Sequence, residues 1–119
     1  SYIDKAGEPK GAIWGHDTDD DSYLKKDGTT VGTDVLESYL KESGASLNNE
    51  LAFYCGTGWR ATIPFLICYE NGYKNAALYD GGWYQWQMDD SLPVQLGDPA
   101  SGNVSYTTVG ELSADKAAK

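Results

Sequence analysis

Cys55 is the residue whose surroundings most clearly favour chemistry, because it begins the segment Cys-Gly-Thr-Gly-Trp-Arg at residues 55–60. A thiol attacks only as the thiolate, which is stabilised where backbone N–H groups and the N-terminus of a helix converge on the sulfur. Gly56 and Gly58 permit backbone angles that other residues avoid, so the N–H groups of this turn can point inward and bind an anion. We therefore predict that Cys55 is a reactive nucleophile.

Arg60 places a permanent positive charge at the end of this segment. It could stabilise the thiolate, hold the loop by bonding carbonyls or a carboxylate, or bind an anionic substrate. The competing interpretation is that Cys55 is a small buried residue in a glycine turn and that Arg60 is an ordinary surface residue. Cys68 does fit the buried case, since it follows Phe-Leu-Ile, and we expect no disulfide between the two cysteines.

Three short segments must position Cys55. Residues 51–54 are apolar without alternation, which is typical of a strand covered on both faces, and residues 76–79 predict a second buried strand. Between them, residues 61–71 predict a helix, with Pro64 tolerated in the first turn and Gly72 at the end. Strand, helix and strand form a βαβ unit with parallel strands and a right-handed crossover. The Cys55 turn then lies at the carboxyl end of a strand, where open α/β sheets bind their ligands.

Further elements are expected on either side of this unit. The first expected helix of the chain has Asp34 as its N-terminal cap, with Glu37 three residues on, and ends at Gly44. The expected elements are a buried strand at 11–15, this helix at 35–43, a short helical segment at 84–88, an extended segment at 92–94, and a polar stretch from residue 100 whose end, 111–119, is helical or frayed.

The composition predicts one small folded domain. The chain has 119 residues, of which 40% are hydrophobic and 13% aromatic, unlike the composition of disordered chains. Its formal net charge is -9 with no cluster of Lys or Arg, so the summed field repels nucleic acid and anionic lipid. No apolar run is long enough to span a membrane. Neither nucleic acid nor a membrane span is expected.

Three segments in order along the chain resemble the rhodanese family. Residues 54–61, Tyr-Cys-Gly-Thr-Gly-Trp-Arg-Ala, resemble its active-site loop, a cysteine and the five residues after it that open a helix. Residues 8–12, Glu-Pro-Lys-Gly-Ala, resemble its Arg-Ile-Pro-Gly-Ala element, and residues 78–83, Leu-Tyr-Asp-Gly-Gly-Trp, its Tyr-Asp-Gly-Ser-Trp element. The resemblance covers residues 7–90 and implies an α/β fold: a rhodanese-like three-layer domain with a central parallel sheet flanked by helices.

The same resemblance implies a sulfurtransferase. Cys55 would take sulfane sulfur from a small-molecule donor such as thiosulfate, become a persulfide, and pass the sulfur to cyanide or a thiol. No metal or organic cofactor would be needed, and Asp80 and Trp83 would have mainly structural roles. The persulfide would be held by the backbone of the loop residues Gly56, Thr57, Gly58, Trp59 and Arg60.

Two sulfur donors remain open on the sequence. The start of the loop, Cys-Gly-Thr-Gly, resembles the Cys-Gly-Ser-Gly of the mercaptopyruvate branch of the family. However, Trp59 and Arg60 depart from the Val-Thr of that branch and place a cation beside the site. Because thiosulfate is an anion, we favour it over mercaptopyruvate.

One departure concerns the start of the domain. Family members begin with a strand and an Asp-Val-Arg-like segment before the region that resembles residues 1–10, and this sequence contains neither. We therefore expect an N-terminally incomplete rhodanese-like domain at residues 1–99, a polar tail at 100–119, and a longer parent protein whose missing N-terminal segment or further domains complete the fold. A catalytically weak module for binding or sensing is the main alternative.

A phosphatase is a second alternative enzyme class, because phosphatases share the strand–loop–helix device. Their loop has five residues between the cysteine and the arginine, whereas four separate Cys55 from Arg60, and the residue immediately before Cys55 is Tyr54 rather than a histidine. The shorter loop favours sulfur over a phosphoryl group.

The acidic run from Asp17 to Asp21 could bind calcium through carboxylate oxygens. Ser22 and Gly28 stand where an EF-hand requires Gly and Glu, so we expect a solvated loop instead. His16 is the only histidine; we place it in a loop near the site and consider a catalytic role for it the minor interpretation.

The tryptophans divide by position. Trp59 lies inside the reactive loop and is expected at the mouth of the pocket, while the flanking glycines of the others favour core packing over a stacking platform. The expected core tryptophans are Trp14, Trp83 and Trp86.

Overall fold

The computed structural model describes residues 4–113 and shows a mixed α/β fold with two small sheets and three α-helices among them. Strand β2 (Leu51–Phe53), helix α2 (Thr62–Glu70) and strand β3 (Ala76–Leu78) follow one another along the chain. The two strands are parallel, with Leu51 opposite Ala76 and Phe53 opposite Leu78. The predicted βαβ unit is confirmed, and so are Pro64 in the first turn of α2 and the end of that helix at Gly72, whose φ is +81°.

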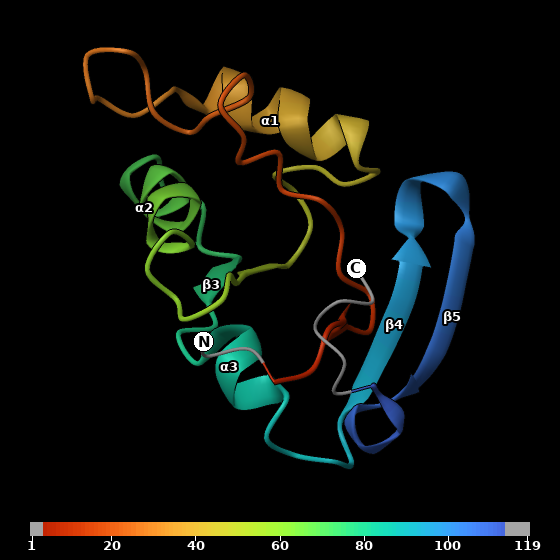
Figure 1. Ribbon diagram of the computed structural model, residues 1–119. Helices are drawn as coiled ribbons and strands as arrows, with labels where there is room; N and C mark the ends of the chain where they lie inside the picture. Colours follow the sequence, from red (N-terminus) through yellow and green to blue (C-terminus); the bar gives the residue numbers. More distant parts are fainter. Residues whose placement is uncertain (1–3, 114–119) are drawn as a thin grey trace.

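A second sheet is antiparallel. Strand β4 (Pro93–Asp98) pairs on one side with β1 (Glu8–Pro9) and on the other with β5 (Asn103–Thr108). The 3₁₀ helix η1 (Pro99–Ser101) joins β4 to β5, and Figure 1 shows the resulting hairpin standing opposite the β2–β3 pair. The extended segment predicted at 92–94 is therefore the beginning of a longer strand.

Three more helices complete the described chain: α1 (Thr33–Glu42), α3 (Gly82–Trp86) and the 3₁₀ helix η2 (Val109–Glu111). The predicted capping box of α1 is wrong. Gly32 is the N-cap residue with no side-chain cap bond, and the Glu37 carboxylate instead accepts a hydrogen bond of 2.8 Å from the Leu47 N–H. That carboxylate therefore fixes the loop after α1 rather than the start of the helix.

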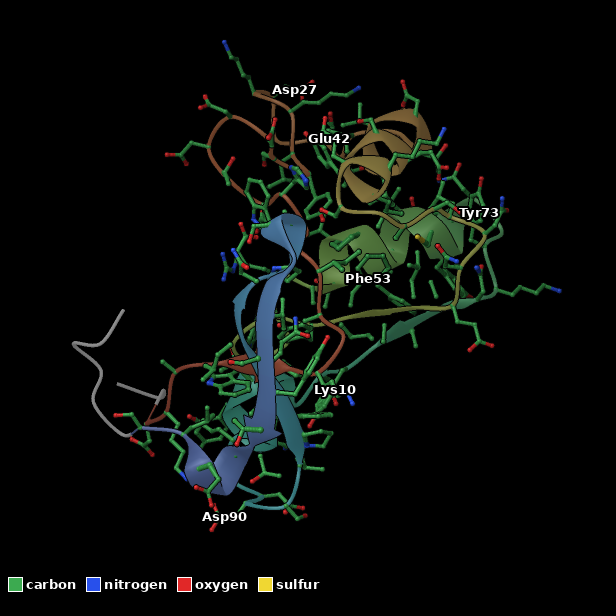
Figure 2. All side chains as sticks on the ribbon, turned by 90° about the vertical axis from the view of Figure 1, so that its right-hand side faces the viewer. Lys10, Asp27, Glu42, Phe53, Tyr73 and Asp90 are labelled. Carbon is green, nitrogen blue, oxygen red and sulfur yellow. The ribbon has the colours of Figure 1, made fainter. Side chains whose placement is uncertain are left out.

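The apolar side chains form two separate cores. In the first, which α1 and α2 cover, Phe53 and Tyr73 are partly buried beside helix α2 (Figure 2). The buried residues of this core are Tyr23, Val31, Leu36, Leu40, Leu47, Ile67 and Cys68. The second core lies where α3 meets the antiparallel sheet, and its buried residues are Trp83, Val94, Val109 and Leu112.

The predicted buried strand at residues 11–15 is wrong. These residues form no regular element, and Trp14, expected in the core, is 59% exposed, whereas Trp83 is buried as predicted. In Figure 1 this segment runs between the hairpin and the β2–β3 pair towards α1. Its apolar residues line an open cavity instead of filling a sheet.

The parallel sheet is also smaller than expected. Among residues 4–113 it has only two strands, and Ala52 and Ala77, which face each other across the pair, are both exposed. A strand covered on both faces, as the apolar run at 51–54 predicts, would bury Ala52. The central sheet flanked by helices is thus represented here by one βαβ unit, with one face of that unit open.

The polar stretch after residue 100 contributes to the fold. Strand β5 pairs with β4 from Asn103 to Thr108, and Val109 and Leu112 are buried in the second core. The expected helical or frayed end at 111–119 lies largely outside the described residues. The division of the chain into a domain at 1–99 and a tail at 100–119 stays a prediction.

Candidate functional site

Cys55 lies two residues after the end of β2 and seven residues before α2 begins, at the carboxyl end of a parallel strand as predicted. Its thiol is partly buried, while Cys68 is completely buried inside α2. Both cysteines are free. Of the two thiols, Cys55 alone is therefore accessible to a reagent.

Backbone N–H groups converge on the Cys55 thiol. Burial raises its pKa, but these hydrogen bonds outweigh burial, so the pKa of Cys55 lies below its ordinary value. A lowered pKa increases the thiolate fraction at neutral pH. The donors are the N–H groups of Ala61, Thr57, Gly58 and Arg60.

Ala61 is the donor that sequence reasoning missed. The predicted cradle ended at Arg60, yet the N–H of the next residue, the N-cap of α2, also bonds the sulfur. The first N–H groups of a helix have no partner within the helix. The predicted start of the helix was the signal that could have added Ala61 to the set.

Gly56 contributes differently from the other loop residues. Its carbonyl accepts a hydrogen bond of 2.9 Å from the Tyr84 N–H, and the Cys55 carbonyl accepts one of 2.9 Å from the Trp83 N–H. The beginning of α3 therefore clamps the reactive loop by its carbonyls, leaving the loop's own N–H groups to face the sulfur. A buried indole helps to fix α3, because Trp83 Nε1 donates to the Lys5 carbonyl at 2.8 Å.

Two glycines are required where the Cys55 loop and the segment at residues 80–82 approach each other closely. Gly58 has φ +92°, and a Cβ there would meet the carbonyl oxygen of Asp80 and lie 2.9 Å from its Cα. Gly82 has φ +60°, and a Cβ would lie 2.5 Å from the Cys55 carbonyl oxygen. Any larger residue would push the two loops apart.

Arg60 is paired with a carboxylate. One guanidinium nitrogen, Nη1, lies 3.6 Å from Oδ2 of Asp17, and 67% of the Arg60 side chain is exposed. Of the roles left open by the sequence, the structure therefore displays contact with a carboxylate. Trp59 is 83% exposed and is not among the residues that line the cavity beside Cys55.

An open cavity of about 1150 Å³ lies beside Cys55. Its walls come from the reactive loop, β2, the segment before α1 and the end of β4. Cys55, Gly56 and Arg60 line it together with Asp17. The volume exceeds that of a small sulfur donor, since drug-sized ligands occupy pockets of about 300–1,000 Å³.

His16 does not reach Cys55. Its ring is 4% exposed and stacks between the rings of Trp14, at a centroid distance of 4.0 Å, and Tyr39, at 5.4 Å. Its Nε2 lies 3.2 Å from the Ser43 hydroxyl oxygen. The histidine therefore anchors its loop against α1, and the adjacent Asp17 contacts Arg60.

Within residues 4–113, no group of three or more His, Cys, Asp or Glu side chains is arranged to hold a metal ion. Residues 17–20 of the acidic run are exposed and Asp21 is partly buried. The Asp21 N–H donates to the Thr18 hydroxyl at 3.0 Å. In the same part of the chain, none of the helices combines the length and apolar character needed to cross a bilayer.

Comparison with known proteins places these features in a family. The model of the family described as "Rhodanese-like domain" matches residues 5–89. Thiosulfate sulfurtransferase YnjE of Escherichia coli is 39% identical over 102 residues, and the putative thiosulfate sulfurtransferase SseB of Mycobacterium tuberculosis is 30% identical over 95. The alignments cover 82% and 76% of this chain but only 23% and 33% of those relatives.

Solved structures agree. The crystal structure of YnjE superposes with a TM-score of 0.72 at 38% identity, covering 87% of this chain and 26% of YnjE. A variant of EanB that carries a cysteine persulfide, in a tetrahedral intermediate state with ergothioneine, gives 0.68 at 34% identity, covering 82% and 24%. The chain therefore spans about a quarter of these proteins, and it belongs to the rhodanese-like domain family, homologous to the thiosulfate/3-mercaptopyruvate sulfurtransferases.

Proposed function

We propose that this chain is a sulfurtransferase domain in which Cys55 carries sulfane sulfur as a persulfide. The observation that carries the proposal is the convergence of four backbone N–H groups on the Cys55 thiol. The same groups can stabilise the anionic outer sulfur of a persulfide, because they are fixed before the reaction and need no rearrangement. The persulfide form of the related EanB is consistent with this chemistry.

The proposed reaction has two steps. The Cys55 thiolate attacks the outer sulfur of thiosulfate, the sulfur–sulfur bond of the donor breaks, and sulfite leaves with the bonding electron pair. Cyanide or a thiolate then attacks the outer sulfur of the persulfide, and the Cys55 thiolate is released. Charge and atoms balance in both steps, and the shared intermediate predicts ping-pong kinetics.

We propose thiosulfate as the donor, with mercaptopyruvate as the alternative. The sulfurtransferase relatives include proteins named for each donor. Arg60 provides a cation that an anionic donor can approach, since most of its side chain is exposed. Gly56, Thr57, Gly58 and Trp59 form the rest of the donor-binding loop.

Mass spectrometry tests the intermediate directly. The 119-residue chain is incubated with thiosulfate, freed of small molecules and analysed intact and after proteolysis. We expect a mass gain of one sulfur atom on the peptide that contains Cys55, and its loss on addition of cyanide with formation of thiocyanate. A modified Cys68 peptide, or an unmodified chain, would contradict the proposal.

We also propose that an extended segment outside residues 1–119 occupies the cavity and pairs with β2. Ala52 is an apolar residue of β2, yet it is exposed and lines this cavity. Among the described residues β2 pairs only with β3, so its other edge is free to pair with a further strand. Without that strand the domain would act as the weakly catalytic module considered above.

Amide hydrogen exchange tests this second proposal. The exchange rates of residues 51–54 are compared between the 119-residue chain and a longer polypeptide from the parent gene. We expect slower exchange in the longer polypeptide, with faster thiocyanate formation. Identical exchange rates in the two would remove the proposal.

A further inference from the structure

A carboxylate stands at the entrance to the Cys55 site. Oδ2 of Asp17 is 3.6 Å from Nη1 of Arg60, and the two side chains are 36% and 67% exposed. Both residues line the cavity that contains Cys55. The cation that would attract an anionic donor therefore already has a negative partner.

The backbone around Asp17 is fixed on both sides. The loop is anchored against α1 by the buried His16 ring, and this packing places the next residue, Asp17, beside Arg60. The hydrogen bonds that hold the loop are Tyr23 hydroxyl to Gly15 carbonyl, Ser43 hydroxyl to Trp14 carbonyl at 2.6 Å, and Thr18 N–H to Asp21 carbonyl at 3.2 Å.

The field of this carboxylate reaches the wall of the cavity. Burial raises the pKa of Tyr23 to about 12, and the negative charge of Asp17 is the next largest contribution. Tyr23 lines the same cavity as Cys55. A charged donor in the cavity experiences the same carboxylate, and the repulsion grows with the donor's negative charge.

We propose that Asp17 is a specificity-determining residue: by pairing with Arg60 it weakens the binding of dianionic donors at Cys55 relative to monoanionic donors. The reaction it acts on is the proposed sulfur transfer, and the inference rests on that function. Asp17 contacts Arg60 rather than the reacting sulfur, so its effect falls on donor binding and not on the thiolate itself. Thiosulfate is a dianion and mercaptopyruvate a monoanion, so the two donors should respond unequally to its removal.

Alkylation of Cys55 tests the electrostatics without requiring sulfur transfer. Iodoacetate and iodoacetamide have nearly the same shape but differ by one negative charge. The rate constant for iodoacetate divided by that for iodoacetamide therefore reports the local electrostatic field. In Asp17→Asn we expect this ratio to rise about two- to five-fold, the range for an exposed ion pair. Peptide mapping separates reaction at Cys55 from reaction at the buried Cys68.

Asp19→Asn is the matched control. Asp19 lies two residues away in the same exposed loop, and within the described residues it neither forms an ion pair nor lines the cavity. The substitution changes the net charge of the chain by the same amount, and we expect the ratio to remain unchanged. An equal rise in both variants would show a general charge effect and overturn the proposal.

A double variant identifies the partner. Arg60→Gln should lower the iodoacetate-to-iodoacetamide ratio, and Asp17→Asn introduced into that variant should raise it less than in the wild type, since the shared interaction is already gone. Full additivity of the two changes would show that Asp17 does not act through Arg60. Circular dichroism of each variant checks that the fold is retained.

Steady-state kinetics extend the test to the donors. In Asp17→Asn the KM for thiosulfate should fall about two- to five-fold, with a smaller fall for mercaptopyruvate and little change in kcat. An equal or larger fall for mercaptopyruvate would contradict the specificity role. If the wild-type chain transferred no sulfur from either donor, the proposed function would fail, whereas the alkylation ratios would still decide the role of Asp17.

Discussion

The reactive loop, residues 55–60, and the acidic loop, residues 17–21, both reach the Cys55 site, but they are built in different ways. In the reactive loop, four N–H groups from residues within six positions of Cys55 surround its sulfur. In the acidic loop, Asp17 arrives beside Arg60 from a position 43 residues earlier in the chain, held there by packing of His16 against α1. A contiguous segment thus supplies the proposed chemistry, and a distant segment adjusts the charge around it.

The largest expected effect comes from the thiol itself. Cys55→Ala should abolish sulfur loading and thiocyanate formation while leaving the free energy of unfolding nearly unchanged, because this side chain is only partly buried. Cys68→Ala should retain activity but lose about 1–2 kcal/mol of stability, since it removes a completely buried side chain from the first core. Thiocyanate assays and urea unfolding measure both quantities. Equal activity losses in the two variants would contradict the assignment of sulfur transfer to Cys55 and of a purely structural role to Cys68.

A smaller effect is expected from crowding the reactive loop. Gly58→Ala places a methyl group against the Asp80 carbonyl, so the loop must shift and the N–H groups must move away from the sulfur. We expect a loss of about 2–4 kcal/mol of stability from left-handed strain plus overpacking. The rate of Cys55 alkylation at neutral pH should also decrease.

Gly44→Ala is the control for this prediction. Gly44 has φ +86°, close to that of Gly58, but a Cβ there would meet nothing within 4 Å. It should therefore show only the strain cost of about 1–2 kcal/mol, with unchanged alkylation of Cys55. Equal losses in the two variants would argue that the approach of Asp80 is unimportant.

A substitution at His16 in the loop before α1 is expected to lower mainly the free energy of unfolding. His16→Asn removes the ring that stacks between Trp14 and Tyr39, while asparagine tolerates the φ of +60° at this position. We expect a loss of about 1–3 kcal/mol in urea unfolding. Alkylation of Cys55 by neutral iodoacetamide should stay within about two-fold of the wild type, because the imidazole does not touch the thiol. A large fall in that rate would assign His16 a part in the chemistry.

The smallest effect is a shift along the pH axis. Because the pKa of Cys55 is lowered in the folded chain, the midpoint of its alkylation rate against pH should lie below that of the same chain unfolded in urea. Because the folded pKa is the lower one, ionised Cys55 adds to the free energy of unfolding above its unfolded pKa, and this stabilisation is lost as pH falls through its folded pKa. Parallel pH profiles of the folded and unfolded chains measure the shift. A folded midpoint at or above the unfolded one would contradict the cradle.

The same contrast explains which parts of the fold could be predicted. The apolar runs at 51–54 and 76–79, the helix between them and the stop at Gly72 are local signals, and all of them match the structure. The run at 11–15 has a similar local pattern, yet among the described residues it pairs with no strand. A strand needs a partner that its own sequence does not specify.

The candidate site divides in the same manner. Residue types and spacing predict Cys55, its loop and Arg60 as site residues, since glycines, a cysteine and a helix start carry their meaning within a few residues. The partner of Arg60 was left open, because three possible roles were compatible with its sequence position. Only the placement of the acidic loop showed that the Asp17 carboxylate lies beside it.

The sequence by itself determined the reactive loop, the βαβ unit that carries it and the family to which the chain is similar, because each depends on residues close together in the chain. The tertiary structure alone decided that Gly82 lies against the Cys55 carbonyl, that His16 packs on α1 and that Asp17 faces Arg60. These contacts join residues far apart in the chain, and their geometry follows from how the two cores and the loops between them pack rather than from any local pattern.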